Sequence, residues 1–278
     1  MRPTASIVIP TRARPAYLEV ALSSVIPQST RAGAEVIVVN DGDDPSTAEV
    51  AQRYGVGVVA LERPSGVSAG RNAGALAARS DLVVLIDDDV NALPGWLGAF
   101  ISGAEEYPDY EVFGGPIRAV LEGGGPRACG RESAPITSLD LGTQDQDTEL
   151  VWGANMAFRR RVFDWVGLFD ETLLGCGDEE DWLGRNMANG GRIRYLAGAG
   201  VEHRRVAADA TVRALARAAY GRGRAARRYD IHRGEAPAKA SELRTLAGCG
   251  WHTVRRRCAN GVVLAAHSAG RLREALSE

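Results

Sequence analysis

Three consecutive carboxylates, Asp87, Asp88 and Asp89, directly follow an apolar run at residues 82–86. Such a run, rich in β-branched residues, predicts a strand buried on both faces of a parallel sheet. In open α/β sheets, ligands bind just outside the carboxyl ends of the strands. Three adjacent anions repel one another, and oxygen ligands beside a phosphate-bearing substrate favour Mg²⁺ or Mn²⁺ over a softer metal. The alternative is a solvated acidic turn before Pro94, because aspartate is common in turns.

A second acidic cluster, Asp178, Glu179, Glu180 and Asp181, stands at the start of a predicted helix that ends near Gly190. The helix macrodipole favours anions at this end, which accounts for one or two of the four carboxylates. Crowded carboxylates raise one another's pKa values, and this suits one of them to act as a general base near neutral pH.

Other chemistry-bearing residues follow the first two predicted strands. Pro10 and Thr11 end the first strand, and Asp41 follows the second. Because the ends of neighbouring parallel strands meet at one rim, we expect these residues to lie close to the triple aspartate. A carboxylate at the position of Asp41 suits ribose hydroxyls or a base edge, although Asn-Asp-Gly is also a good turn sequence.

Arg71 lies near the start of a Gly/Ala-rich loop and helix at 66–78. Its guanidinium could reach a diphosphate, since guanidinium groups pair well with phosphate oxygens; a surface salt bridge is the alternative. The glycines here form neither a dinucleotide-binding motif nor a P-loop, which disfavours dinucleotide oxidoreductases and P-loop kinases. Gly70 and Gly74 would instead let the helix pack close to the sheet. An isolated histidine such as His203 is more often a surface or core residue than a metal ligand.

The elements that must position these residues alternate between strand and helix, which predicts a parallel sheet with helices on both faces. The expected strands are 6–10, 35–39, 56–61 and 82–86, with helices at 16–25, 46–54 and 66–78. Beyond Pro94 we expect helices at 96–105, 159–166 and 178–190, and strands at 111–115 and 192–196, the last of which is followed shortly by Val201-Glu202-His203. Residues 122–148 lack periodicity, and so long an irregular segment is usually a functional loop or a mobile lid.

Charge divides the chain of 278 residues unevenly. The formal net charge is −2, but residues 206–278 carry 14 Lys+Arg against 6 Asp+Glu, while residues 1–205 are net acidic. This basic segment predicts helices at 207–229, 241–258 and 262–276. Their arginines suit either a solvated face or contact with an anionic membrane surface. Nucleic-acid binding is disfavoured, because aromatic residues do not interleave with the arginines.

The four cysteines, Cys129, Cys176, Cys249 and Cys258, show no C-x-x-C pair and no zinc-ligand spacing. We therefore interpret them as free thiols in a reducing compartment. No signal peptide and no run of about 18 apolar residues is visible. We expect a cytoplasmic protein, either free or peripheral at the inner face of the plasma membrane.

Seven blocks of sequence, in order across residues 5–205, resemble the family-2 glycosyltransferases with the GT-A fold. The blocks are Ser6-Ile7-Val8-Ile9-Pro10-Thr11-Arg12, Val38-Val39-Asn40-Asp41-Gly42, Gly70-Arg71-Asn72-Ala73-Gly74, Leu85-Ile86-Asp87-Asp88-Asp89, Gly153-Ala154-Asn155, Gly167-Leu168-Phe169-Asp170-Glu171 and Asp178-Glu179-Glu180-Asp181-Trp182-x-x-Arg185. The resemblance implies an α/β, Rossmann-like GT-A domain at 1–205, with a mostly parallel central sheet flanked by helices. Residues 1–90 would be its nucleotide-binding half and 91–205 its acceptor and catalytic half. Residues 206–278 would form a basic α-helical C-terminal extension.

The resemblance also implies the chemistry. The enzyme would move a sugar from a nucleotide-diphosphate sugar to an acceptor hydroxyl, with inversion and with Mn²⁺ or Mg²⁺ as cofactor. The acceptor would be a glycan, a lipid-linked or a small-molecule acceptor, and a homodimer is compatible with this family. Two rivals stay open: a nucleotidyltransferase, disfavoured because no glycine-rich, lysine-bearing loop follows the first strand, and a non-catalytic nucleotide-sugar-binding scaffold, disfavoured because both acidic clusters are intact.

The site residues implied by the resemblance fall into four groups. The nucleotide and donor would be bound by Pro10, Thr11, Arg14, Asp41, Arg71, Asp87 and Asp88. The metal would be held by Asp89, Asp87 and His203, and the acceptor or sugar pocket lined by Trp152, Gly153, Asn155 and Asp178. Many relatives carry Glu-Asp-x-Asp-Leu where this chain has its second cluster. Alignment on Asp181 and Arg185 makes Glu179 the first candidate for the base and Glu180 the second, with Asp181 as a structural or acceptor-binding residue.

Overall fold

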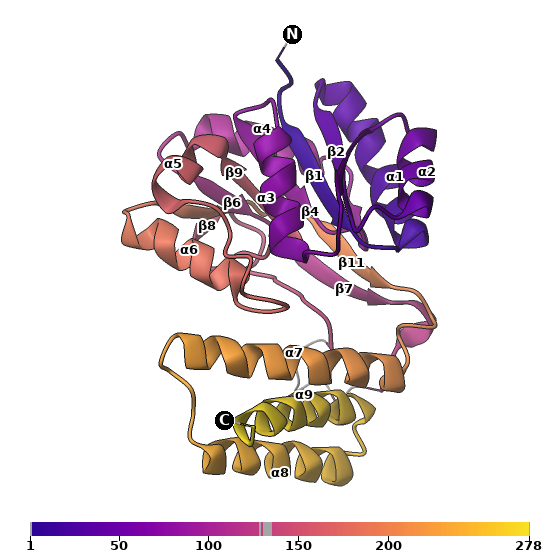
Figure 1. The fold of residues 1–278 in the computed structure, drawn as a ribbon, viewed down its shortest axis with the longest axis vertical. Coiled ribbons are helices and arrows are strands. Elements are labelled where there is room, and N and C mark those ends of the chain that lie inside the picture. The colour runs from indigo at the N-terminus through magenta and orange to yellow at the C-terminus, as the bar shows by residue number, and fades with distance from the viewer. Residues whose placement is uncertain (1, 128, 130–134, 278) are drawn as a thin grey trace. The chain divides into compact units, whose positions relative to one another are not determined.

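The computed structural model describes residues 2–127, 129 and 135–277. These residues form two compact units (Figure 1). The sheet unit comprises residues 1–118, 138–172 and 178–203, and the helical unit comprises 119–137, 173–177 and 204–278. The helical unit therefore takes up two internal segments as well as the C-terminal residues.

The central sheet is mixed and largely parallel. Within the described residues it has eight strands in the order β3-β2-β1-β4-β9-β6-β10-β8. The strands are β1 (Ser6–Thr11), β2 (Glu35–Asp41), β3 (Gly57–Leu61), β4 (Leu82–Ile86), β6 (Val112–Gly114), β8 (Gln146–Thr148), β9 (Asn155–Arg159) and β10 (Ile193–Tyr195). The first four run parallel to one another, whereas β9 lies antiparallel between β4 and β6. A smaller sheet has the order β5 (Val90–Ala92), β11 (Val201–Arg205), β7 (Ile117–Leu121).

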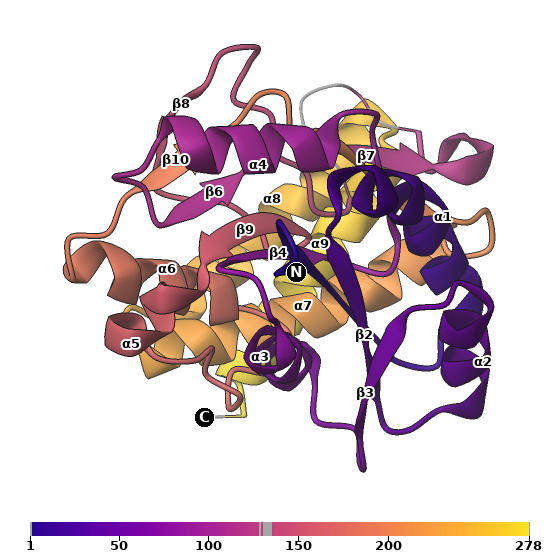
Figure 2. The same ribbon diagram turned by 90° about the horizontal axis from the view of Figure 1, so that it is seen from above.

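Helices cover both faces of the central sheet, as Figure 2 shows from above. The helices are α1 (Pro15–Ala32), α2 (Pro45–Arg53), α3 (Val67–Ala77), α4 (Trp96–Glu106), α5 (Phe163–Val166) and α6 (Asp178–Ala188). One face packs against α1, α2 and α4, and the other against α3, α5 and α6. Alternate residues of β1 serve the two faces, with Ile7 and Ile9 in the first core and Val8 in the second.

The close packing of α3 on the sheet, expected from its small residues, is confirmed. A Cβ atom on Gly74 would lie 2.2 Å from Cγ1 of Val8 in β1, so no larger residue fits there without movement. This approach brings the N-terminus of α3 to the carboxyl ends of β1 and β2.

Two expected elements differ from the structure. The helix expected at 159–166 is wrong in its first half, because Arg159 ends β9 and residues 160–162 form a 3₁₀ turn before the short α5. Pairing of β9 with β4 and β6 outweighed the local helical pattern. The first helix continues to Ala32 through Pro27, because its buried face extends past Val25 to Ser29. The irregular segment at 122–148 contains a 3₁₀ turn at Glu122–Gly124 and strand β8, and its residues 128 and 130–134 lie outside the described residues.

The helical unit contains α7 (Val212–His232), α8 (Lys239–Arg256) and α9 (Ala259–Ala275). Its apolar core joins Leu215 of α7 and Val263 of α9 to Ile136. Part of its arginine content is internal: Arg271 lies 2.6 Å from Asp230 and 2.7 Å from Glu242. Some arginines of this unit are therefore held in ion pairs and do not belong to the solvated face expected from sequence. None of the helices described is both long enough and apolar enough to cross a bilayer.

Candidate active site

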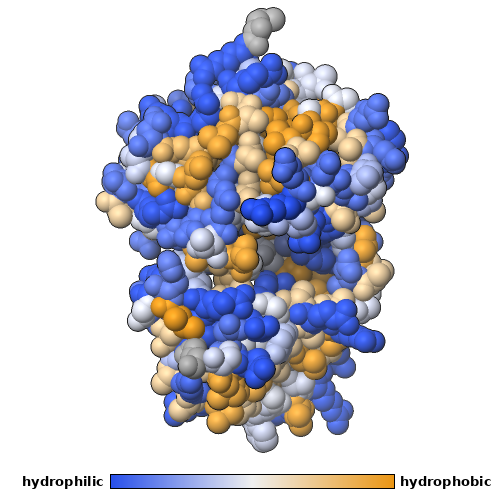
Figure 3. All heavy atoms as spheres, in the orientation of Figure 1, coloured by the Kyte–Doolittle hydropathy of each residue, from blue (hydrophilic) through white to orange (hydrophobic). Residues whose placement is uncertain are grey.

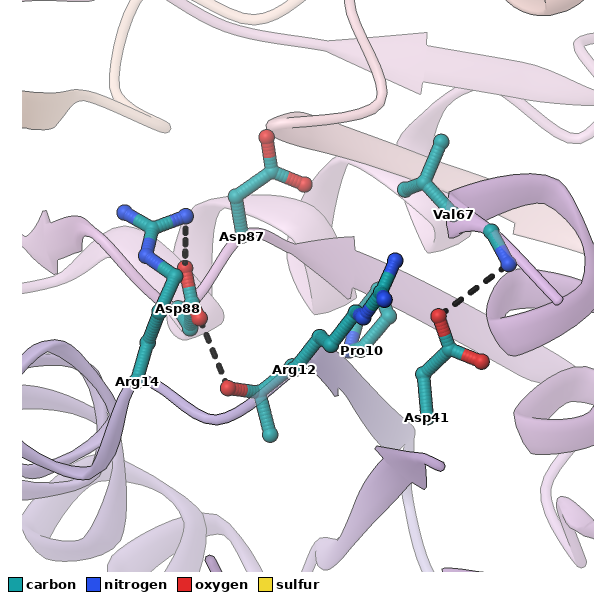
Figure 4. Close-up of a pocket in the computed structure, with 9 residues that line it drawn as sticks. Pro10, Arg12, Arg14, Asp41, Val67, Asp87 and Asp88 are labelled. Atoms are coloured by element: carbon teal, nitrogen blue, oxygen red, sulfur yellow. Dashed lines mark hydrogen bonds and ion pairs between the residues drawn. The ribbon is translucent and has the colours of Figure 1, made fainter. Parts of the chain in front are cut away.

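The carboxyl ends of β1, β2 and β4 and the start of α3 surround a cavity of about 290 Å³, shown in Figure 4. Its lining brings together residues that the strand-end argument predicted to meet. The residues that line it are Pro10, Thr11, Arg12, Arg14, Asp41, Gly66, Val67, Asp87 and Asp88. A pocket at the carboxyl ends of parallel strands is where α/β sheets bind their ligands.

Asp41 forms one side of this cavity and is nearly buried. Its carboxylate accepts hydrogen bonds from the backbone amides of Ser65, at 2.6 Å, and Gly66, at 3.1 Å. These bonds fix the loop that precedes α3. Since a carboxylate has about four acceptor positions, Asp41 keeps capacity for one or two donors on a ligand.

Arg14 holds two of the three consecutive aspartates. It lies 2.6 Å from Asp89. At Asp88, Arg14 lies 3.0 Å away and the Thr11 hydroxyl donates at 2.7 Å (Figure 4). Burial raises the pKa of Asp88 to about 7, and the attraction of Arg14 and the hydrogen bond from Thr11 only partly oppose this shift. The nearby charge of Asp89 adds to the rise. Arg14 thus offsets part of the repulsion between Asp88 and Asp89.

Asp89 also meets His203. Strand β11 pairs with β5 so that His203 lies opposite Val90, the residue after Asp89. Its Nε2 atom lies 3.2 Å from Oδ1 of Asp89, and both side chains are buried. In the sequence this histidine is isolated from other metal-ligating residues. Pairing of β11 with β5 in the smaller sheet brings it beside Asp89. Asp87, whose side chain is 30% exposed, instead lies 3.5 Å from Arg71.

Arg71 links the two acidic clusters. Its side chain is only 3% exposed, and Nη1 lies 2.7 Å from Asp178 and 3.0 Å from Glu179. A Cβ atom on residue 153 would lie 2.3 Å from Nη2, so Gly153 leaves the space that the guanidinium occupies. Arg71 is therefore neither on the surface nor among the residues that line the cavity. It joins the strand-end cluster to the N-terminus of α6.

The two acids beside Arg71 shift in opposite directions. Burial raises the pKa of Asp178 to about 7, and the charge of Glu179 adds to this rise against the attraction of Arg71. Burial also opposes ionisation of Glu179, but Arg71 and hydrogen bonds from Asp178 and the Gly153 amide hold its pKa below the usual value. Crowding thus raises a pKa in this cluster, as expected, but at Asp178 rather than at Glu179. The lowered pKa of Glu179 favours its carboxylate form, but its direction is opposite to the raised pKa that the acidic cluster led us to expect of a general base.

Other residues predicted to belong to the site have structural contacts. Asp181 lies 2.9 Å from Arg185, whose Nη2 donates to the Leu168 carbonyl at 2.9 Å and so ties α6 to the preceding turn. Asn155 is fully buried, and its amide donates to Ala199 O at 2.7 Å while its oxygen accepts from Trp96 at 2.8 Å.

Trp152 and Glu180 are the remaining residues predicted to belong to the site. Trp152 packs against the apolar core. Neither Trp152 nor Asn155 is among the residues that line the strand-end cavity. Glu180 is half-buried in the first turn of α6.

Sequence reasoning missed Arg12 as a candidate. It lines the cavity and is exposed to solvent. Its place directly after Thr11, at the end of a buried strand, is a signal that could have found it, because the next residues from such a strand face the ligand crevice.

A family profile covers more than half of the chain. Residues 6–167 match the profile described as Glycosyl transferase family 2. A glucosyl-dolichyl phosphate glucuronosyltransferase of Haloferax volcanii is 28% identical over 152 residues, which cover 52% of this chain and 49% of that protein. The glycosyltransferase AglE of the same organism is 24% identical over 182 residues, covering 63% of this chain and 59% of that protein. The chain thus spans about half the length of these relatives.

Solved structures share the fold. The crystal structure of GalNAc-T7 with UDP, GalNAc and Mn²⁺ superposes with a TM-score of 0.59 at 17% sequence identity. The match covers 80% of this chain and 47% of that one. At this identity the likeness concerns the fold.

Proposed function

Because the chain belongs to glycosyl transferase family 2, we propose that it transfers a sugar from a nucleotide-diphosphate sugar to an acceptor hydroxyl. The observation that carries this proposal is the strand-end cavity, which has Asp41 on one side and Asp87 and Asp88 on the other. A carboxylate for nucleoside hydroxyls or a base edge, two cavity-lining arginines and an acidic cluster form a complementary set for such a donor.

The donor would lie along the carboxyl ends of the strands. In this arrangement Asp41 binds the nucleoside, while Pro10 and Thr11 form the floor beneath it. Arg12 is exposed in the cavity and is a ready partner for a phosphate oxygen, whereas Arg14 is already engaged by Asp88 and Asp89. Asp87 and Asp88 then face the ribose or the sugar.

Asp89 and His203 are the residues that would hold a divalent cation. Asp89 and His203 are buried in mutual contact, and carboxylate oxygens such as those of Asp89 are ligands that suit Mn²⁺ or Mg²⁺. Asp87 is the third candidate ligand, with its partly exposed carboxylate beside the cavity. When bound, the cation supplies Lewis-acid stabilisation of charge that develops on the leaving diphosphate. The GalNAc-T7 structure, which contains UDP and Mn²⁺, supports this role by analogy.

Glu179 is the proposed general base. It takes the proton from the acceptor hydroxyl as that oxygen attacks the anomeric carbon from the face opposite the diphosphate, which inverts the configuration without a covalent intermediate. Arg71 and the Gly153 amide hold its carboxylate in place, at 3.0 Å and 3.3 Å. Asp178, hydrogen-bonded to Glu179, acts as a positioning residue. Glu180 is the second candidate for the base.

Donor binding is tested by thermal unfolding with UDP-, GDP- and dTDP-sugars in the presence of Mn²⁺, Mg²⁺ or EDTA. A ligand at about 100 times its Kd stabilises the native state by about 2.7 kcal/mol, which corresponds to a rise in Tm of roughly 5 °C or more. We expect one nucleotide to give this rise, with a smaller rise in EDTA. Asp41→Asn should remove most of the shift, whereas Asp81→Asn, which changes an exposed carboxylate of the same unit, should not.

Two results would contradict this reading of the donor site. If no nucleotide sugar shifts the Tm, the strand-end cavity is not a donor site in the free protein. If nucleoside triphosphates are consumed with release of pyrophosphate, the protein is a nucleotidyltransferase instead. A full shift without any turnover, with a range of acceptors, would favour the binding scaffold.

We propose further that α8 contacts an anionic membrane surface, where a lipid-linked acceptor would be found. Leu243, Trp251 and Val254 are 58%, 66% and 74% exposed, and their spacing places them on one side of the helix. The guanidinium of Arg255 lies over the Trp251 ring, 5.9 Å from its centroid. Figure 3 shows apolar and hydrophilic residues interleaved over the helical unit. Exposed apolar side chains with adjacent arginines are typical of interfacial helices.

Sedimentation with phosphatidylglycerol-containing vesicles tests this contact. We expect Trp251→Glu to reduce the bound fraction several-fold, because it removes an apolar anchor and adds a charge that anionic lipids repel. Trp165→Glu is the matched control, since Trp165 is an exposed tryptophan of the sheet unit. Equal binding by both variants, or no binding at low salt, would exclude α8 as a membrane anchor.

A further inference from the structure

We propose that the helical unit binds Zn²⁺ through Cys129, His252 and Cys258. The ligand atoms of these three side chains all lie within 4.8 Å of one another. Their separation along the chain hides the site from motif analysis, because Cys129 precedes His252 by more than 120 positions. The cluster belongs to the helical unit alone and has no role in the proposed transfer chemistry.

Two of the ligands are fixed by the turn between α8 and α9. His252 lies in the last part of α8, and Cys258 directly precedes α9. The Cys258 amide donates to Thr253 O at 3.1 Å, and Arg257 between them adopts a left-handed φ of 48°. These features return the chain sharply, so that the buried Cys258 side chain comes back beside the helix that carries His252. The turn between α8 and α9 thus sets the separation between His252 and Cys258.

The third ligand, Cys129, lies in the sequence between two described residues that contact the same helices. Before Cys129, the Arg127 carbonyl accepts a hydrogen bond from the Asn260 amide in the first turn of α9, at 3.2 Å. After it, Ile136 packs into the core formed by Leu215 and Val263. Arg127 and Ile136, which precede and follow Cys129 in the sequence, thus both contact these helices, and the Cys129 thiol lies 3.4 Å from His252 Nε2.

The separation of Cys129 and His252 is close to that of two ligands of a tetrahedral zinc ion. Zn–S bonds of about 2.3 Å and Zn–N bonds of about 2.05 Å place sulfur and nitrogen about 3.6 Å apart, and two sulfurs about 3.8 Å apart. Cys129 Sγ lies 3.4 Å from His252 Nε2, within a few tenths of an ångström of that separation. Two thiolates and an imidazole form a donor set that selects Zn²⁺ over Mg²⁺ or Ca²⁺. Three protein ligands leave one position, which water can fill on the side of Cys129, the partly exposed thiol of the pair, since Cys258 is buried.

A bound ion would cross-link two parts of the helical unit. It would join the segment at 119–137 to the corner between α8 and α9, so that its binding free energy adds to the stability of the helical unit. A thiol–imidazole hydrogen bond or a disulfide between Cys129 and Cys258 are the alternative uses of the same side chains.

The test is the metal content of the 278-residue protein, reduced, reconstituted with Zn²⁺ and desalted. We expect one zinc per chain, a fall in Tm on chelation, and a thiolate-to-cobalt charge-transfer band when Co²⁺ replaces Zn²⁺. Cys258→Ser and His252→Ala should each weaken zinc binding by at least about tenfold. Cys249→Ser is the matched control, because this thiol lies in α8 but contacts Ser268 Oγ at 3.5 Å.

Three outcomes would overturn the site. The first is less than a stoichiometric amount of zinc in fully reduced, reconstituted protein. The second is unchanged zinc binding in both Cys129→Ser and Cys258→Ser, which would show an adventitious metal. The third is a Cys129–Cys258 disulfide that persists in intact-mass analysis under mild reduction. If the variants fail to fold, the cobalt spectrum of the unaltered protein decides, and absence of the charge-transfer band excludes thiolate ligation.

Discussion

Glu179→Gln is expected to lower the rate of sugar transfer by about 10²–10⁴-fold, the usual contribution of a general base, while donor binding stays unchanged. Glutamine keeps the shape of the side chain and can still accept from the Gly153 amide, but it cannot take a proton. Arg71 retains Asp178 and Asp87 as partners, so the fold around it should survive. The measurements are kcat with a saturating acceptor and the Tm shift produced by the donor.

Glu180→Gln is the matched control for this substitution. It changes the neighbouring carboxylate in the same turn of α6 and leaves the contacts of Arg71 intact. A near-normal rate in Glu179→Gln, with a large loss in Glu180→Gln, would transfer the role of the base to Glu180. Large and equal losses in both variants, with reduced donor binding, would indicate a structural defect instead.

Arg71→Met is expected to destabilise the protein by about 3–5 kcal/mol, the cost typical of breaking a buried charge pair. Methionine fills part of the volume, but the buried Asp178 and Glu179 then lack the cation that offsets them. The free energy of unfolding from urea titration measures the effect. Arg2→Met is the control, because its pair with Asp81 is exposed and should contribute no more than about 1 kcal/mol.

The loss in Arg71→Met should depend on pH in a defined direction. Without the guanidinium, burial raises the folded-state pKa of both acids above their unfolded values. The folded protein then binds more protons than the unfolded chain, so stability falls as pH rises through the raised pKa values. The difference from the unaltered protein should therefore shrink in mildly acidic buffer. Arg71→Met/Asp178→Asn should recover part of the stability at neutral pH, and no recovery would show that the loss comes from packing alone.

The sequence by itself determined the strand-end cluster. Buried β-branched runs, each followed by polar residues, are sufficient to predict parallel strands, and parallel strands must present their carboxyl ends at one rim. Asp41 and Asp88 therefore meet at one cavity although 46 residues separate them, and Thr11 contacts Asp88 directly. The same local pattern placed the second acidic cluster at the start of α6.

Only the tertiary structure decided which charges face one another. Arg71 and Asp178 come from α3 and α6, and their contact at 2.7 Å depends on how both helices pack on one face of the sheet. The opposite pKa shifts of Asp178 and Glu179 follow from that contact and from burial. Neither can be predicted from four consecutive acidic residues in the sequence. Likewise, the contact between Cys129 and His252 joins residues that are 123 positions apart in the sequence. Local periodicity specifies elements and their ends, whereas side-chain pairs distant in sequence arise from packing, which depends on the whole chain.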